Sequence, residues 1–178
     1  MKTTAILIAG FGGQGTLFAG KVLAVASLMK GLEVSWLPSY GPEMRGGTAN
    51  CSVMISDSPI GSPIVSKPDV LLALNKPSFE KYGKVTVPGG RIFVDSSLVD
   101  VKSSRDDISV WYIPATATAV KAAGSAGLSN IVLIGKAMKE TGLFTEEEII
   151  EAITEIVPKS KQNLLDANVK ALRAGMNS

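Results

Sequence analysis

The sequence predicts an α/β protein with a Rossmann-like, open and mostly parallel sheet flanked by helices, and with a helical C-terminal third. The run Thr3–Ala9 is short, apolar and β-branched, which is typical of a strand covered on both faces. A glycine-rich loop over 10–15 follows this run. Residues 16–30 then have the composition of a helix, with Gly31 as its C-terminal cap. After Pro114 the pattern becomes one of successive helices.

Apolar runs and turn residues divide the rest of the chain into further elements. We expect strands at Glu33–Leu37 (ended by Pro38), Thr48–Ser56, Asp69–Leu74, Arg91–Val94 and Ser109–Ile113, with a short hairpin partner at Ile60–Val65. We expect helices at Pro77–Tyr82, Ala115–Ala123, Ser129–Glu140, Thr145–Val157 and Ser160–Ala174, the last stopped by Gly175. Thr145 and Glu148 have the spacing of a capping box, and 102–107 looks like a polar, mobile connection.

Length and charge set the class of protein. The chain has 178 residues, is 46% hydrophobic and has a formal net charge of +2, so we expect one domain over 1–178 with a substantial core. The weak charge and the short basic runs argue against a nucleic-acid partner. The nearly uncharged stretch 4–29 is interrupted by Gln14, Lys21 and several glycines. We therefore expect neither a signal peptide nor a membrane span, and a cytoplasmic location.

Two residue counts exclude whole chemistries. The chain has no histidine, which removes Ser-His-Asp and Cys-His nucleophiles and imidazole metal ligands. Its single cysteine, Cys51, excludes an internal disulfide, a Cys-x-x-Cys pair and a self-contained iron–sulfur cluster. We expect Cys51 to be a buried structural residue and we expect no metal site on this chain. Electron transfer or demanding acid–base chemistry would have to come from a bound cofactor or from another chain.

Charge is distributed unevenly along the chain. Residues 1–66 hold seven charged side chains, whereas the shorter segment 136–178 holds thirteen. The helices at the C-terminal end therefore look solvated. A charge-poor half in a small chain indicates a permanent partner surface, and a merely deep sheet is the alternative.

The glycine loop has the spacing of the dinucleotide fingerprint at Gly10, Gly12 and Gly15, between a strand and a helix. Glycines there let backbone N–H groups approach an anion at the start of the helix. An acidic residue should end the second strand to hold a ribose, but that strand ends in Ser35–Pro38, and Glu33 lies at its other end. The loop is therefore better evidence for the fold than for bound NAD or FAD.

A second loop, Ser39–Gly47, combines one cation, one anion and one tyrosine with a glycine pair. We expect it at the same edge of the sheet as the glycine loop, where open α/β folds bind ligands. Arg45 can pair with a phosphate or a carboxylate. The alternative is a contact between Arg45 and Glu43 that only fixes the loop.

The two loops together resemble a known family, the gamma subunit or gamma domain of 2-oxoacid:ferredoxin oxidoreductases. The resemblance rests on Gly10-x-Gly12-Gly13-Gln14-Gly15 and on Tyr40-Gly41-Pro42-Glu43-Met44-Arg45-Gly46-Gly47. Pro114-Ala115-Thr116, Asn130, Asn168 and Gly175 resemble later landmarks. The segment Thr48–Cys51 is closer to the 2-oxoglutarate and branched-chain groups than to the pyruvate group.

The resemblance implies the activity of a complex. These enzymes convert a 2-oxoacid, coenzyme A and oxidised ferredoxin to acyl-CoA, carbon dioxide and reduced ferredoxin. Thiamine diphosphate with magnesium lies between the alpha and beta subunits, and the iron–sulfur clusters are on the delta or beta chains. Alpha, beta and delta subunits would be the partners of this chain, with ferredoxin an indirect one. Which 2-oxoacid is used, and whether the isolated chain self-associates, stay open.

The resemblance also suggests where a ligand and partners would bind. The candidate site for an anion such as the coenzyme A pyrophosphate comprises Gly10, Gly12, Gly13, Gln14, Gly15 and Arg45. The candidate interface comprises Tyr40, Gly41, Pro42, Glu43, Met44, Arg45, Gly46, Gly47 and Asn50. One alternative for the site is that the glycines only allow close packing of a partner chain. Two alternatives for the function are a stand-alone Rossmann-type nucleotide-binding protein and a scaffold or regulatory module that reuses this domain.

Overall fold

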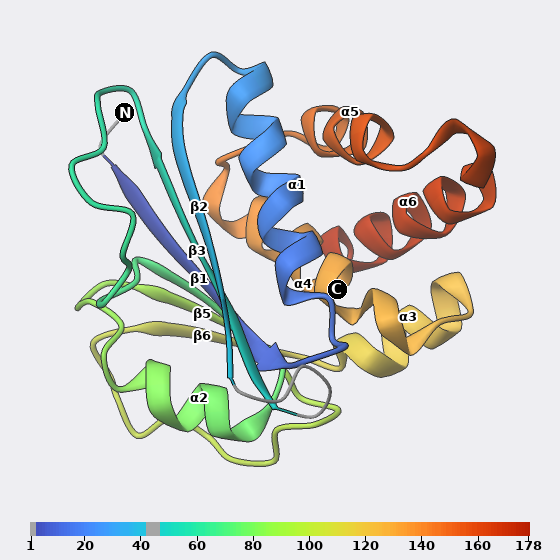
Figure 1. Ribbon diagram of the computed structural model, residues 1–178. Coiled ribbons are helices and arrows are strands. Elements are labelled where there is room, and N and C mark those ends of the chain that lie inside the picture. Colours follow the sequence, from blue (N-terminus) through green and yellow to red (C-terminus); the bar gives the residue numbers. More distant parts are fainter. Residues whose placement is uncertain (1–2, 42–46) are drawn as a thin grey trace.

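The computed structural model describes residues 3–41 and 47–178, which build a six-stranded sheet with helices on its two faces (Figure 1). The strands are β1 (Thr4–Phe11), β2 (Glu33–Tyr40), β3 (Thr48–Ser56), β4 (Val70–Ala73), β5 (Arg91–Asp95) and β6 (Ser109–Ile113). The helices are α1 (Thr16–Met29), α2 (Lys76–Gly83), α3 (Ala115–Ala123), α4 (Ser129–Thr141), α5 (Glu146–Ile156) and α6 (Gln162–Met176). Short 3-10 turns precede α4 and α6, at Ala126–Leu128 and Lys159–Lys161.

The strand order is β2-β3-β1-β4-β5-β6. β1, β4, β5 and β6 are mutually parallel, and β3 is antiparallel to both of its neighbours, β1 and β2. β2 therefore runs in the same direction as β1, as the strand–loop–helix–strand pattern predicts, but β3 separates the two. The predicted α/β fold with a mostly parallel sheet and a helical last third is confirmed.

The sheet buries apolar side chains on both faces, which explains the uninterrupted apolar runs of its central strands. On one face Ile8, Leu72 and Phe93 join a core covered by α1 and by α3 to α6. On the other face Leu7 packs with Phe79 of α2 and with loops. Figure 1 shows the same division, with α2 the one described helix on its side of the sheet.

Two predicted features of the strands are wrong. β2 does not end at Pro38 but continues to Tyr40. It lies at the edge of the sheet, where a residue without an N–H group is tolerated. The segment Ile60–Val65 forms no strand, because Pro59 directly precedes it and Pro63 lies within it.

The last helix also differs from the prediction, because Gly175 lies inside α6 and does not stop it. Gly175 is instead the point where α6 crosses α4, and a Cβ there would overlap the backbone of Val132. A Cβ at Gly135 of α4 would overlap the Leu172 carbonyl in the same way. The predicted cap at Gly31 is confirmed, since this residue follows α1 with a left-handed φ of +72°.

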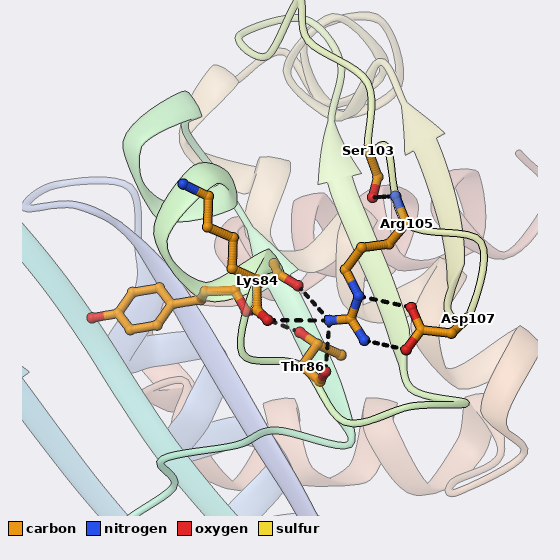
Figure 2. Close-up of polar contacts among 7 residues, drawn as sticks. Lys84, Thr86, Ser103, Arg105 and Asp107 are labelled. Atoms are coloured by element: carbon orange, nitrogen blue, oxygen red, sulfur yellow. Dashed lines mark hydrogen bonds and ion pairs between the residues drawn. The ribbon is translucent and has the colours of Figure 1, made fainter.

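The predicted capping box at α5 is confirmed. The Thr145 hydroxyl accepts from the Glu148 N–H at 3.3 Å, and the Glu148 carboxylate accepts from the Thr145 N–H at 2.9 Å. The segment 102–107, in contrast, is not a loose connection, because Arg105 joins it to the end of α2 (Figure 2).

Within the described part of the chain, no single helix has the length and apolar character of a membrane span. The segments Ala115–Ala123 and Ala126–Thr141 reach that length and character only together, across a bend of 118°.

Candidate functional site

The glycine loop leads from the carboxyl-terminal end of β1 into α1. Gly13 and Gly15 have positive φ angles of +99° and +72°, which favour glycine. Gly15 is the N-cap of α1, and a Cβ there would overlap the side-chain amide of Asn130. At Gly13 a Cβ would meet nothing within 4 Å among the residues that the structure describes. The loop thus needs its glycines for conformation and for packing.

Gln14 closes the glycine loop from inside. Its Oε1 accepts a hydrogen bond from the Phe11 N–H at 2.6 Å, and its Nε2 donates to the Leu74 carbonyl at 2.9 Å. A Cβ on Gly10 would stand only 2.7 Å from that Oε1. Both ends of the Gln14 amide are therefore occupied within the protein, which makes Gln14 a bridge between the ends of β1 and β4.

Asn130 joins the starts of two helices. This buried residue lies in the first turn of α4, and its Nδ2 donates to the Gly15 carbonyl at 2.9 Å. No side-chain hydrogen bond caps α1 at Gly15, and the first turn of α1 contains no acidic residue. The free N–H groups and the partial positive charge of a helix start favour an anion at this point.

The second loop meets the glycine loop, as expected. The Gly12 N–H donates to the Gly47 carbonyl at 2.8 Å, and the Gly41 N–H donates to the Thr48 carbonyl at 2.8 Å. Tyr40, at the end of β2, has 48% of its surface exposed. The remaining predicted residues of this loop, Pro42, Glu43, Met44, Arg45 and Gly46, lie outside the residues that the structure describes.

Asn50 faces a small cleft between the start of β3 and α2, which we call the α2 cleft. It is lined by Phe11, Asn50, Asn75, Ser78, Lys81 and Tyr82, among others. The Asn50 Nδ2 donates to the Tyr82 hydroxyl at 3.4 Å, and the Lys81 Nζ lies 5.0 Å from the centre of the Tyr82 ring. The α2 cleft has a volume of about 60 Å³ and admits only a small group, since ligand pockets commonly measure roughly 300–1,000 Å³.

Asn75, Lys81 and Tyr82 were not predicted as site residues from the sequence. All three belong to α2 or its N-cap, and α2 reaches the glycine loop only because β4 lies beside β1. No local spacing signals that approach. Asn75 has one recognisable feature: it precedes Lys76-Pro77 as an N-cap, and its Oδ1 accepts from the Ser78 N–H at 2.9 Å.

A larger cavity, of about 350 Å³, lies at the opposite edge of the parallel strands. It is lined by Asp69, Arg91 and Thr141, among others, and contains no residue of either loop. Within the described ranges, no group of three or more His, Cys, Asp or Glu could hold a metal ion.

Cys51 is buried on β3, as predicted. Burial raises the pKa of its thiol to about 12, against a smaller lowering by a hydrogen bond with Trp36. The thiol therefore stays protonated at neutral pH and is a poor nucleophile.

The geometry also bears on dinucleotide binding. In the Rossmann arrangement the strand beside β1 carries, at its carboxyl end, the acid that holds the ribose. Here that place is taken by β3, which is antiparallel and sets Ala49 and Asn50 opposite Gly10 and Ala9. This edge of the sheet resembles the dinucleotide fold in its loop but not in the strand next to it.

Comparison with known proteins places the chain in a family. The family described as pyruvate ferredoxin/flavodoxin oxidoreductase matches residues 5–178, and the chain belongs to it. The resemblance predicted from the two loops is therefore confirmed.

Individual relatives include the two groups that the residues after the second loop favoured. The chain is 41% identical to the ketoisovalerate oxidoreductase subunit VorA of Methanothermobacter thermautotrophicus, over 96% of this chain but only 35% of VorA. It is 38% identical to the 2-oxoglutarate synthase subunit KorC of Methanocaldococcus jannaschii, over 90% of this chain and 88% of KorC. The chain thus spans about a third of the length of VorA and most of KorC.

A solved structure has the same fold along almost its entire length. The gamma subunit of a keto/oxoacid ferredoxin oxidoreductase from Geobacter sulfurreducens superposes with a TM-score of 0.82 at 32% identity. The match covers 98% of this chain and 96% of that one.

Proposed function

We propose that this chain is the gamma subunit, or gamma domain, of a thiamine diphosphate-dependent 2-oxoacid:ferredoxin oxidoreductase. The complex converts a 2-oxoacid, coenzyme A and oxidised ferredoxin to acyl-CoA, carbon dioxide and reduced ferredoxin. The observation that carries this proposal is the 38% identity to a 2-oxoglutarate synthase subunit over 88% of its length. The chain would work in the cytoplasm within a hetero-oligomer of alpha, beta, gamma and delta parts.

The proposed role of this chain is structural. It has no histidine, and its one thiol has a pKa of about 12, so it offers neither an imidazole base nor a thiolate. Thiamine diphosphate, bound with magnesium on partner chains, would supply the decarboxylation chemistry, and iron–sulfur clusters there would carry the electrons. We assign no catalytic residue to this chain.

The N-terminal half would supply the surface that meets these partners. Leu28 of α1 is 63% exposed, and Trp36, Leu37 and Tyr40 on the edge strand β2 are each more than a third exposed. A merely deep sheet would hide such side chains. Large exposed apolar and aromatic groups in a charge-poor region are typical of an interface core.

Coenzyme A would contact this chain at the glycine loop. Gly13 and the uncapped start of α1 offer N–H donors to a phosphate. Arg45, which lies outside the described residues, would add its guanidinium. Gln14 would shape the loop, because its amide is already paired. The α2 cleft is too small for a nucleotide, so the ligand would lie between this chain and a partner.

Kinetics of the assembled complex test this site. Replacing Arg45 with Ala should raise the Michaelis constant for coenzyme A by about tenfold, because a charge-assisted hydrogen bond is lost. Lys21→Ala, which removes an exposed charge of α1, is the matched control and should change nothing. If Arg45→Ala does not change the Michaelis constant for coenzyme A, the anion site is refuted. The role of the glycines would then be to allow close packing of a partner chain.

Reconstitution tests the function itself. Mixing this chain with its alpha, beta and delta partners should produce 2-oxoacid-dependent dye reduction that requires coenzyme A and that is lost when this chain is left out. Saturable binding of NAD at micromolar concentration by the isolated chain would instead favour a stand-alone nucleotide-binding protein.

A further inference from the structure

Helix α2 lies between the α2 cleft and the connection from β5 to β6. Its residues Ser78, Lys81 and Tyr82 line the cleft, while Phe79 and Gly83 line a separate hollow that the connection borders. With eight residues α2 is too short to be stable alone, so its position depends on what holds its two ends.

The connection from β5 to β6 holds the carboxyl-terminal end of α2 through one side chain, Arg105. Its Nη1 donates to the carbonyls of Gly83, Lys84 and Thr86 at 2.9, 3.3 and 2.7 Å. Its Nε and Nη2 donate to the two carboxylate oxygens of Asp107 at 2.8 and 2.6 Å. Figure 2 shows the guanidinium between the Asp107 carboxylate and the carbonyl groups at the end of α2.

This arrangement orients the guanidinium as well as binding it. The two-pronged pairing with Asp107 fixes the plane of the Arg105 side chain, which is only 24% exposed. A cation at the end of a helix also satisfies carbonyls that have no partner within the helix. The pairing lowers the pKa of Asp107, through its hydrogen bonds with Arg105, so the carboxylate is ionised at neutral pH.

The same connection holds the start of α2. Lys76 Nζ pairs with Asp100 Oδ1 at 2.9 Å, and the Tyr112 hydroxyl accepts from the Ser103 N–H at 2.7 Å, which fixes the connection to β6. Asn75 caps the same end. At the carboxyl-terminal end the Thr86 hydroxyl donates to the Tyr82 carbonyl at 3.0 Å. The Arg105 guanidinium, paired with Asp107 and bonded to three carbonyls, forms what we call the Arg105 fork, and it makes most of the side-chain hydrogen bonds at this end among the described residues.

We infer that Arg105 is a positioning residue for the α2 cleft: it fixes the end of α2 so that Lys81 and Tyr82 stand beside Asn50 and the glycine loop. Lys81 and Tyr82 immediately precede the anchored carbonyls. The Tyr82 carbonyl also accepts from the Val85 and Thr86 N–H groups at 3.2 and 3.1 Å. Release of the turn after α2 would therefore let Tyr82 move and would break the hydrogen bond that its hydroxyl accepts from Asn50.

Nuclear magnetic resonance on the full chain tests this inference without any activity. In Arg105→Ala, hydrogen exchange of the Val85 and Thr86 amides should become at least about tenfold faster, and the Asn50 side-chain amide should shift. Amides in the core of α4 should keep their protection. Arg105→Lys should rescue only part of the effect, because an ammonium cannot form the fork.

Asp106→Asn is the matched control. It removes the same charge as Asp107→Asn one residue away, from an exposed side chain with no hydrogen bond or ion pair to the described residues. Asp107→Asn should accelerate exchange at Val85 and Thr86, and Asp106→Asn should not. Unchanged exchange in Arg105→Ala, or an acceleration spread evenly over the whole core, would overturn the inference.

The consequence for catalysis rests on the proposed function. In the assembled complex, Arg105→Ala should raise the Michaelis constant for coenzyme A while leaving kcat nearly unchanged. A wild-type complex without 2-oxoacid activity would refute the proposed function, whereas the exchange and Asn50 measurements would still decide the role of Arg105.

Discussion

Gly175 shows how a single residue can set the packing of two helices. A Cβ there would overlap the Val132 carbonyl, which is backbone of α4 and cannot turn aside as a flexible side chain would. Gly175→Ala should therefore destabilise the protein by about 1 kcal/mol, because an overpacking cost of about 2 kcal/mol outweighs the gain of about 1 kcal/mol from Ala in a helix. Urea denaturation should show a lower midpoint at an unchanged slope.

Gly61→Ala is the control for this substitution. Gly61 lies in a loop, and a Cβ there would meet nothing within 4 Å. The free energy of unfolding of Gly61→Ala should differ from that of the wild type by less than about 0.5 kcal/mol. A Gly175→Ala variant as stable as the wild type would show that the crossing of α4 and α6 is wider than the structure has it.

The hydrogen bonds of the Gln14 side chain lead to a second prediction about a single residue. Gln14→Glu replaces the Nε2 donor by an oxygen that faces the Leu74 carbonyl, so one hydrogen bond is exchanged for repulsion. We expect a loss of about 1–2 kcal/mol in the free energy of unfolding. Gln162→Glu, the same change on an exposed side chain, should cost less than about 0.5 kcal/mol. Equal stabilities of the two variants would argue against the bridge between β1 and β4.

At the scale of one element, α5 depends on its capping box. Thr145→Ala removes the acceptor for the Glu148 N–H and should cost about 1 kcal/mol. The hydrogen bond from the Thr145 N–H, and then that from Lys30, lowers the pKa of Glu148 below its ordinary value of 4.5. The stabilisation from this carboxylate is therefore full above about 4.5 and is lost as the pH falls through the lower folded-state value.

Denaturation at several pH values measures this effect. Glu148→Gln should lower the stability at pH 7 and flatten the acid dependence below pH 4.5, the ordinary pKa. Glu151→Gln, on the exposed face of the same helix, should leave the acid dependence as in the wild type. An acid profile of Glu148→Gln that matches the wild type would exclude the capping carboxylate as its source.

The elements were largely predictable from the sequence because their signals are local. Apolar runs, the glycine loop, the Gly31 cap and the Thr145–Glu148 box each act within a few residues. The place of β3 between β1 and β2 was not predictable, since it depends on which strands pair and not on what any strand contains. The role of Gly175 was missed for the same reason: its requirement comes from Val132, far away in the chain.

The candidate site was predictable only in part. Both glycine motifs could be placed at one edge of the sheet, and the Gly12–Gly47 hydrogen bond joins them there. Lys81 and Tyr82 enter the same region from α2, which only the tertiary structure reveals. The internal use of the Gln14 side-chain amide, and of the backbone N–H groups of Gly12 and Gln14, likewise could be seen only in the three-dimensional contacts.

At the scale of the whole molecule, the N-terminal and C-terminal halves differ in charge and in exposed apolar surface. The segment 136–178 holds thirteen charged side chains against seven in the longer segment 1–66, and the C-terminal helices cover one face of the sheet (Figure 1). The N-terminal half presents exposed apolar side chains around the edge strand β2. Such a molecule suits one part of a larger assembly, as the proposed function requires. The central claim is therefore that this chain takes part in 2-oxoacid oxidation only in a complex with partner subunits.

Affinity isolation of the tagged chain from its native cells, with native mass and 2-oxoacid-dependent dye reduction measured on the eluate, tests that claim most directly. We predict a complex several times the 18.6 kDa of this chain. It should contain thiamine diphosphate-binding partners, and its dye reduction should require coenzyme A. A chain that elutes alone, well folded and without activity would contradict the account.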